Sequence, residues 1–383
     1  MGLKMNITAT SLLLLLASST EVFGDTIFYV TKYGAKADGN TDITQALLNA
    51  WRDACASPVV STVMIPDGTY ALGQITIGGP YKAPINFNVQ GTVKSPMDTS
   101  RFKAEAGWIA FQQIDQFILS DGGVFYSQAK PVWGRKCPSS AYCNQLPINL
   151  RFNFITNSMV KDITSRDSKQ FQMNLLGCKN LTFYNVGISA PDIDGNHIGH
   201  SSGINITDST IETGDDCVSI GDGSEQINIQ RVTCGASHGI SMGSLGKYPN
   251  EEPVVGISVK NCTFTNTQNG VRVKTWSASH QGTAFEMHFE DIAMNNVGNP
   301  ITIDQDQGVP CQDVELGDIN LKYNGSEGPT MSQCKNIKPN LLGTQLPRTC
   351  AQLSYLNLLS KSEQIVLLLR FLYSYLMRFL VDC

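Results

Sequence analysis

The sequence predicts a parallel β-helix, a solenoid in which each coil stacks on the previous one. Short runs rich in β-branched and aromatic residues recur from residue 59 to residue 314, separated by Gly, Asn, Asp and Ser. The later runs repeat at about 20–30 residues, which is a solenoid period. Parallel strands in α/β proteins need crossover helices, and no helix-length periodic segment separates these runs. The predicted strands include residues 63–65, 75–77, 117–119, 181–183, 204–206, 227–229 and 257–259.

One amphipathic helix precedes these runs, at residues 44–55, where Thr41 or Asp42 can cap its first turn. Five apolar residues fall on one side of it: Ala46, Leu47, Ala50, Trp51 and Ala54. We expect this helix to cover the open N-terminal end of the β-structure.

A β-sandwich is the alternative fold, because it also has regularly spaced strands. Two-residue Asn-Gly turns are not placed systematically between the runs, which disfavours hairpins. Asparagine instead recurs at one position of the repeat, as expected for side chains that stack along a solenoid. The residues in question are Asn180, Asn205, Asn228 and Asn261.

Composition narrows the functional classes. The 383 residues are 42% hydrophobic and 16% charged, so the chain is globular. The net charge of -5 argues against a general nucleic-acid binder. An anionic substrate would therefore be held by a local positive cluster. The sequence indicates no cofactor, no metal and no membrane partner, and we expect a monomer.

Three segments are expected along the chain. Residues 1–24 have the pattern of a signal peptide, with Lys4 before an apolar run that is too short to span a membrane. Residues 25–350 form a single β-helix domain, and residues 351–383 form a divergent apolar tail. Arg370 and Arg378 make a membrane span in this tail costly. We expect a terminal helix packed on the last coil, or sequence foreign to the ancestral fold.

Secretion permits disulfides, and the 11 cysteines leave at least one unpaired within the chain. Cys217 with Cys234, and Cys334 with Cys350, are the expected pairs. Four Asn-x-Ser/Thr motifs are potential glycan acceptors if they lie on the surface. They begin at Asn180, Asn205, Asn261 and Asn324.

Paired carboxylates, which glycoside hydrolysis requires, occur at Asp215 and Asp216. Strand alternation places Asp216 on the inward side with Val218, and Asp215 outward with Cys217 and Ser219. A charge in an apolar core is costly, so we expect a bend at Gly214 to swing both carboxylates outward. A plain turn or a calcium site is the alternative, but no Asp-rich ligand loop supports calcium.

Cations and an imidazole follow the carboxylates. In residues 271–274, alternation points Val271 and Val273 into the core, and Arg272 and Lys274 outward about 7 Å apart. That spacing suits the carboxylate of a sugar acid, although a solvated strand face is the simpler interpretation. His238 lies one coil after the aspartates in a glycine-rich loop, where a purely structural role is the alternative.

Together, Gly-Asp-Asp-Cys, His-Gly-Ile-Ser-x-Gly-Ser-Leu-Gly and Arg-Val-Lys resemble the polygalacturonases of glycoside hydrolase family 28, most closely the pollen exopolygalacturonases. The resemblance covers residues 25–350 and implies a right-handed β-helix that hydrolyses α-1,4-galacturonan of the cell wall with inversion. It implies that Asp215 is the general acid and that Asp194 and Asp216 activate water. His238 would support the acid, and Arg272 and Lys274 would bind substrate.

Three departures from the family pattern motivate a second hypothesis. Asp192 and Ile193 replace Asn-Thr, and Ala236 and Ser237 replace Pro-Gly before the histidine. Cys311 follows the Ile-Asp-Gln motif almost at once, as if a segment were missing. The alternative is a catalytically impaired β-helix that only binds pectin or a wall component.

Overall fold

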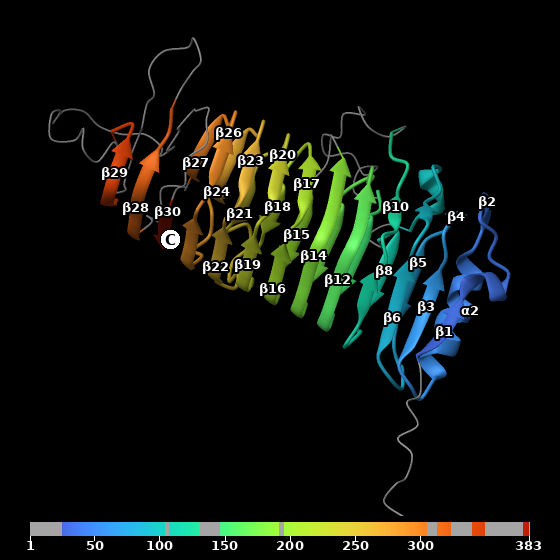
Figure 1. The fold of residues 1–383 in the computed structure, drawn as a ribbon. Helices are drawn as coiled ribbons and strands as arrows, with labels where there is room; N and C mark the ends of the chain where they lie inside the picture. Colours follow the sequence, from blue (N-terminus) through green and yellow to red (C-terminus); the bar gives the residue numbers. More distant parts are fainter. Residues whose placement is uncertain are drawn as a thin grey trace, which may run out of the picture.

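The computed structural model describes residues 25–103, 107–130, 146–190, 195–304, 312–322, 339–348 and 378–382. These residues form a right-handed parallel β-helix, as predicted, with almost all strands in parallel pairs. Figure 1 shows the coils stacked in chain order from β1 to β29, with α2 beside β1 at the N-terminal end. The predicted strand runs all fall in strands, apart from Phe117 at the edge of β9.

One side of the solenoid is a nine-stranded parallel sheet in the described part of the chain, with one strand for each successive coil. Its strands are β5 (Ile75–Gly78), β8 (Ile109–Gln112), β11 (Leu150–Asn153), β13 (Met173–Leu176), β15 (Asn196–Gly199), β18 (Val218–Ile220), β21 (Ile240–Leu245), β24 (Asn269–Thr275) and β27 (Asn299–Asp304). The candidate functional side chains lie on this sheet or in the turns at its edges.

The second sheet has 21 strands among the described residues and contains two parallel rows. The first row holds β1 (Thr26–Tyr29), β3 (Ser61–Ile65), β6 (Ile85–Val89), β9 (Ile118–Ser120), β16 (Ser202–Thr207), β19 (Glu225–Gln230), β22 (Val254–Lys260), β25 (Ala284–Glu290), β28 (Gln312–Asn320) and β29 (Asn340–Leu346). The second holds β2 (Asp38–Asp42), β4 (Thr69–Ala71), β7 (Thr92–Lys94), β10 (Val124–Tyr126), β17 (Thr210–Thr213), β20 (Thr233–Gly235), β23 (Thr263–Thr265) and β26 (Ala293–Asn295). The long strands β12 (Thr156–Arg166) and β14 (Lys179–Ala190) join the rows by pairing with both.

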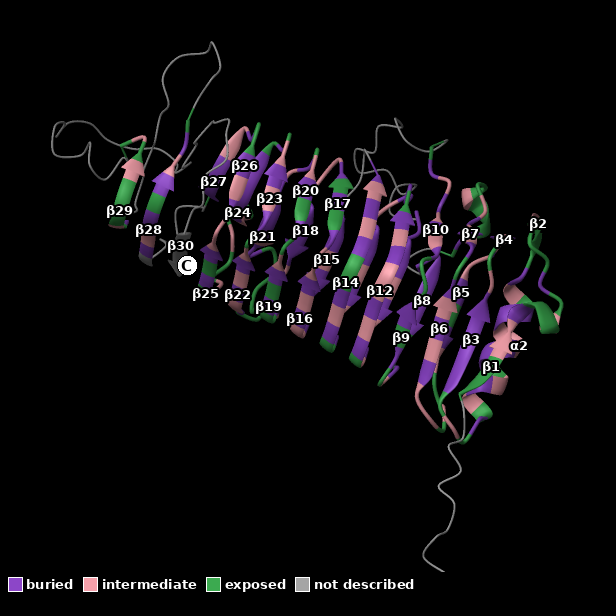
Figure 2. Cartoon of the chain, viewed as in Figure 1, coloured by how far each residue is buried: buried purple, intermediate pink, exposed green. Residues whose placement is uncertain are grey.

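Inward residues of successive coils stack on one another and fill the core. Figure 2 shows buried residues alternating with exposed or half-buried ones along the strands. An aromatic ladder runs through the N-terminal half, where the rings of Phe111 and Phe152 stack with centroids 5.2 Å apart. Phe87 and Phe183 extend it on either side, at 6.2 Å from Phe111 and 5.6 Å from Phe152. These ring contacts stabilise the packing of neighbouring coils by more than the burial of apolar area alone.

The capping helix was predicted correctly. α2 (Thr44–Ala56) buries the five expected apolar residues, and Trp51 reaches the aromatic ladder through Phe87. The N-cap residue is Ile43, which provides no side-chain cap, and Asp42 before it accepts a hydrogen bond from the backbone N–H of Thr44, the first residue of the helix. The remaining helices of the described ranges are the short 3-10 segments η1 (Val30–Tyr33) and η2 (Thr99–Arg101).

The expected asparagine stack is only partly correct. Asn205 and Asn228 are direct register partners, and Asn228 donates to Asn205 at 3.3 Å. Asn180 instead donates to Asn157, at a bend where its φ is 52°. Asn261 also has a positive φ, in the turn after β22. The cause of the error is local, because both asparagines have a left-handed backbone, Asn180 inside β14 and Asn261 in the turn after β22.

The tail was expected to form a terminal helix or to be foreign to the ancestral fold, and its described residues are not helical. Residues 378–382 form a strand, β30 (Arg378–Asp382), that pairs antiparallel with both β25 and β28. Its backbone thereby occupies the position between these two parallel strands. Residues 1–24, residues 351–377, Asn324 and the predicted Cys334–Cys350 pair lie outside the described residues. Among those described, no helix is long and apolar enough to cross a membrane.

Candidate active site

The turn between β17 and β18 carries Asp215 and Asp216 at the edge of the nine-stranded sheet. The next coil is held directly beneath it, because His238 donates its backbone N–H to the Asp215 carbonyl at 2.9 Å. Cys217 donates likewise to the carbonyl of Gly239 at 2.8 Å. Gly239 has a φ of +87°, and a Cβ there would collide with the backbone of Gly270. A larger residue would therefore push this coil away from the next one, which carries β24.

Asp215 and His238 form an accessible hydrogen-bonded pair. His238 Nδ1 lies 2.7 Å from Asp215 Oδ1, and the two side chains are 35% and 51% exposed. The hydrogen bond to Asp215 raises the pKa of His238, and the negative charges of Asp215 and Asp216 add to this effect. Partial burial and Arg272 act in the opposite direction but are outweighed. A proton is thus stabilised between an imidazole and a carboxylate that solvent can reach.

Asp216 is buried, with only 7% of its side chain exposed, and it is fully engaged by polar partners. Oδ1 accepts hydrogen bonds from Ser241 Oγ at 2.7 Å and Arg272 Nη2 at 3.0 Å. Oδ2 accepts from Lys274 Nζ at 3.2 Å. Arg272 also donates through Nε to Ser241 Oγ at 3.2 Å, which fixes the guanidinium. Burying the carboxylate is tolerable because charged donors replace its water.

The strand bearing the two cations has the predicted alternation. Val271 and Val273 are each 1% exposed in the core, and Arg272 and Lys274 lie on the outer face. Their side chains are only 20% and 21% exposed, so they are not a solvated strand face. Both cations are therefore fixed against Asp216 and remain partly accessible to solvent.

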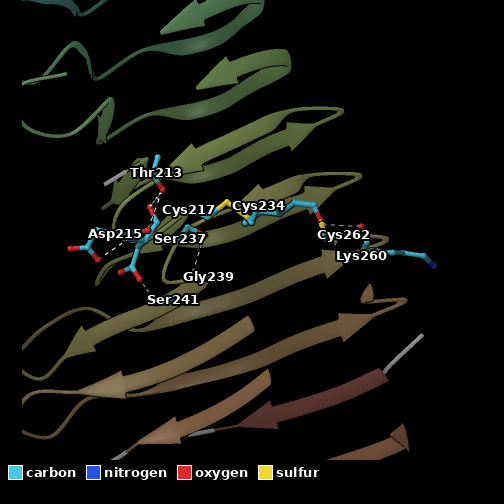
Figure 3. Close-up of a disulfide and its surroundings, with 11 residues drawn as sticks. Thr213, Asp215, Cys217, Cys234, Ser237, Gly239, Ser241, Lys260 and Cys262 are labelled. Atoms are coloured by element: carbon cyan, nitrogen blue, oxygen red, sulfur yellow. Dashed lines mark hydrogen bonds between the residues drawn. A yellow bond between two sulfur atoms is a disulfide. The ribbon is translucent and has the colours of Figure 1, made fainter. Parts of the chain in front are cut away.

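Cys217 does not face outward as strand parity predicted. It is fully buried in the core and forms the predicted disulfide with Cys234, 17 residues away. The parity argument failed because β18 begins only at Val218, so the alternation does not extend back through the turn. Figure 3 shows Asp215 and Ser241 on one side of this disulfide and the free thiol of Cys262 on the other. The disulfide joins the acidic turn to the following coil.

Sequence reasoning missed three polar residues of the site, although outward parity could have indicated them. His197, Ser219, Ser241 and Arg272 are consecutive register partners across four strands. His197 Nδ1 lies 2.8 Å from Ser219 Oγ, and the His197 ring packs on Phe171 with centroids 5.3 Å apart. Burial lowers the pKa of His197, against the opposing charges of Asp216 and Asp222. A neutral imidazole therefore extends the polar row beside the carboxylates.

Asp194, the third predicted carboxylate, lies outside the described residues together with residues 191–193. The next residue, Gly195, donates its N–H to the carbonyl of Asp216 at 2.8 Å. The first described residue after this gap is therefore in direct contact with the acidic pair.

The donor set of this site also bears on metal binding. Ligand atoms of Asp215, Asp216 and His238 all lie within 4.8 Å of one another, which is close enough for one ion. Asp216 is already neutralised by Arg272 and Lys274, and both cations would repel a metal ion at the same oxygens. The residues present therefore fit a metal poorly, and the absence of a metal cofactor stays a prediction.

The site combines adjacent carboxylates, a hydrogen-bonded imidazole and two fixed cations at the edge of the nine-stranded sheet. These are the groups that a glycoside hydrolase acting on an acidic polysaccharide requires. The sequence matches glycosyl hydrolases family 28 across residues 55–308, a span that includes every described residue of the site. The chain belongs to this family.

Named relatives agree with this assignment. The chain is 45% identical to a polygalacturonase of Nicotiana tabacum over 397 aligned positions, covering 91% of this chain and 98% of the relative. It is 46% identical to an exopolygalacturonase of Oenothera organensis, covering 81% and 98% of the two chains. The solved exopolygalacturonase of Thermotoga maritima is 20% identical, with a TM-score of 0.56 over 67% of this chain and 70% of that one. This last similarity supports the fold.

Proposed function

We propose that the protein is a secreted, exo-acting polygalacturonase that hydrolyses α-1,4-galacturonosyl linkages of pectin in the cell wall. The names of the plant relatives support the substrate class and the exo assignment. One observation on this chain carries the proposal: Asp215 is accessible and paired with His238, whereas the adjacent Asp216 is buried beneath two cations. Neighbouring carboxylates in such different environments suit different roles.

In the proposed reaction Asp215 donates a proton to the leaving glycosidic oxygen. His238 orients the carboxyl group and, as an imidazolium, replenishes its proton. Asp194 and Asp216 hold the attacking water. Arg272 and Lys274 hold the Asp216 carboxylate in place and direct their remaining donors to the carboxylate of the bound sugar.

Inversion is the expected stereochemical outcome, with Asp194 as the main partner of the acid. Acid and base in inverting enzymes are about 6.5–9.5 Å apart, leaving room for water. Asp215 and Asp216 are closer, with ligand oxygens within 4.8 Å, so this pair alone leaves too little room. NMR of the first product formed would decide the matter, because inversion releases the β-anomer from an α-linkage. An α-anomer would instead indicate double displacement, with Asp216 as the nucleophile.

The primary test is the release of reducing ends from polygalacturonate by the purified protein and by Asp215→Asn. We expect turnover by the wild type, with monomer as the sole early product, and loss of about 10²–10⁴-fold in the variant. Equal activity in both proteins would remove Asp215 as the acid. Binding without turnover at any enzyme dose would favour the pectin-binding alternative over the enzyme.

A further inference from the structure

An exposed aromatic residue directly follows the strand that holds the two cations. β24 ends at Thr275, and Trp276 follows it, two positions beyond Lys274 and so about 7 Å from it. The Trp276 side chain is 46% exposed, but its backbone N–H is fixed by donation to the Leu245 carbonyl at 2.8 Å. A large apolar surface therefore lies at a set position next to the site.

The loop after β21 brings a second exposed aromatic residue beside the first. Glu251 accepts hydrogen bonds from the backbone N–H groups of Gly246 at 2.6 Å and Tyr248 at 3.0 Å. His280, in the segment after Trp276, donates its N–H to the Gly246 carbonyl at 2.9 Å and joins the two loops. Tyr248 is 59% exposed on this braced turn. The turn is held by its own carboxylate and needs no ligand to form.

Lys247 lies between the two rings. Its Nζ is 5.3 Å from the centroid of Trp276 and 5.1 Å from that of Tyr248. Within the described ranges, no carboxylate is within ion-pair distance of this ammonium. Scattered exposed aromatic residues are ordinary on protein surfaces. Here, however, the rings of Trp276 and Tyr248 both contact the ammonium of Lys247, and they lie next to the proposed site for an acidic polymer. This arrangement suggests a functional role.

The chemistry of this cluster matches one kind of ligand. Aromatic faces pack against the C–H faces of a sugar ring, and an ammonium binds a carboxylate as a point charge. A neutral sugar would use only the rings, and a simple anion would use only the lysine. We propose that Trp276, Tyr248 and Lys247 form a subsite that binds a further uronosyl ring of the chain held at Arg272 and Lys274. This inference rests on the proposed function for the identity of the polymer.

Binding of oligogalacturonates of one to six units tests the subsite, with every variant made in the Asp215→Asn background so that no ligand is cleaved. Trp276→Ala should weaken binding about ten-fold, or about 1.4 kcal/mol, for chains long enough to reach the subsite and leave shorter chains unaffected. Lys247→Ala should weaken binding of the same long chains at low salt, and less so at high salt. Methyl-esterified chains should respond to Trp276→Ala but not to Lys247→Ala, because the ester carries no charge.

Matched controls come from β14, where Tyr184 and Lys179 are also exposed but on the other sheet. Tyr184→Ala and Lys179→Ala should leave binding unchanged at every length. Trp276→Phe retains a ring and should fall between the wild type and Trp276→Ala, which guards against misfolding as the cause.

An unchanged affinity at all lengths, or an equal loss at all lengths including the monomer, would overturn the subsite. Hydrolysis by the wild type reports separately on the proposed function. Active enzyme with no length-dependent effect would reject the subsite alone. Length-dependent binding by a protein without turnover would reject the enzyme and retain the subsite.

Discussion

The guanidinium of Arg272 donates to Oδ1 of Asp216 at 3.0 Å, and this ion pair links residues 56 positions apart in the sequence. Lys274 holds the other carboxylate oxygen, so one strand neutralises a buried acid from the coil two turns earlier. The two residues that were expected only to bind substrate therefore also hold a proposed catalytic carboxylate in position. Substitutions on this strand should affect turnover as well as substrate binding.

Lys274→Ala should raise the half-saturating galacturonan concentration and also lower kcat, with kcat/KM reduced on the order of ten-fold or more. The substrate carboxylate loses one contact, and Asp216 loses one of its two cations. Salt should diminish the effect only in part, because the Lys274 side chain is 21% exposed and thus incompletely screened. Steady-state kinetics at two ionic strengths would measure both components.

Lys260→Ala is the matched control for Lys274→Ala, because Lys260 pairs with Glu290 at 3.1 Å on the other sheet. Its kinetics should equal those of the wild type. A Lys274→Ala variant with unchanged KM and unchanged kcat would show that neither contact matters.

The pH dependence should report on His238. The Asp215 hydrogen bond raises its pKa above the ordinary value of about 6.5. The imidazolium–carboxylate pair is therefore complete below that ordinary value and is lost as pH rises through the raised pKa. We expect kcat/KM to fall on this alkaline side, and His238→Gln to lower the maximum about 10–100-fold and remove that limb.

His288→Gln serves as the control for His238→Gln, since His288 is exposed on β25 of the other sheet. Its profile should match the wild type. An alkaline limb that persists unchanged in His238→Gln would assign that titration to another group.

The sequence was sufficient for the fold because the solenoid repeats one local rule in every coil. Each strand needs only inward apolar residues such as Val271 and Val273, and each turn needs residues that tolerate tight bends. The site depends on contacts between coils, which parity within one segment does not describe. Asp216 lies outside the apolar core, as the expected bend at Gly214 required and against strand parity, but it is buried among Ser241, Arg272 and Lys274.

The same limit explains the incorrect placement of Cys217 and the omission of His197. Cys217 lies in the turn before β18, so the strand alternation that placed it outward does not apply to it. His197 belongs to the site because it contacts Ser219 and Phe171, which come from the neighbouring coils. The missing information was the start of β18 for Cys217 and the register between coils for His197.

Loss of the Cys217–Cys234 disulfide should reduce both stability and activity. The bridge closes a 17-residue separation, for which about 2–4 kcal/mol of stabilisation is typical. It also fixes the turn that carries Asp215 and Asp216. The double variant Cys217→Ser/Cys234→Ser should unfold at lower denaturant concentration and show reduced kcat well below its unfolding temperature.

Cys262→Ser provides the comparison for the disulfide variant, because Cys262 is a buried free thiol near the bridge. This change should lower stability modestly and leave kcat unchanged. A double-serine variant with full kcat at low temperature would show that the turn holds its shape without the bridge.

The final prediction concerns β30, which pairs through its backbone with β25 on one side and β28 on the other. Unpaired strand edges are sites of aggregation, so removing this strand should expose two of them. Leu380 is the register partner of both His288 and Glu315, and Leu380→Pro would delete its backbone donor at the centre of this pairing. We expect the variant to lose about 1–3 kcal/mol of stability through the lost ladder hydrogen bond, and to form oligomers that size-exclusion chromatography detects. Leu380→Val keeps the backbone donor and should remain wild-type in both measurements. A monomeric Leu380→Pro protein of unchanged stability would show that β25 and β28 do not depend on the C-terminal strand.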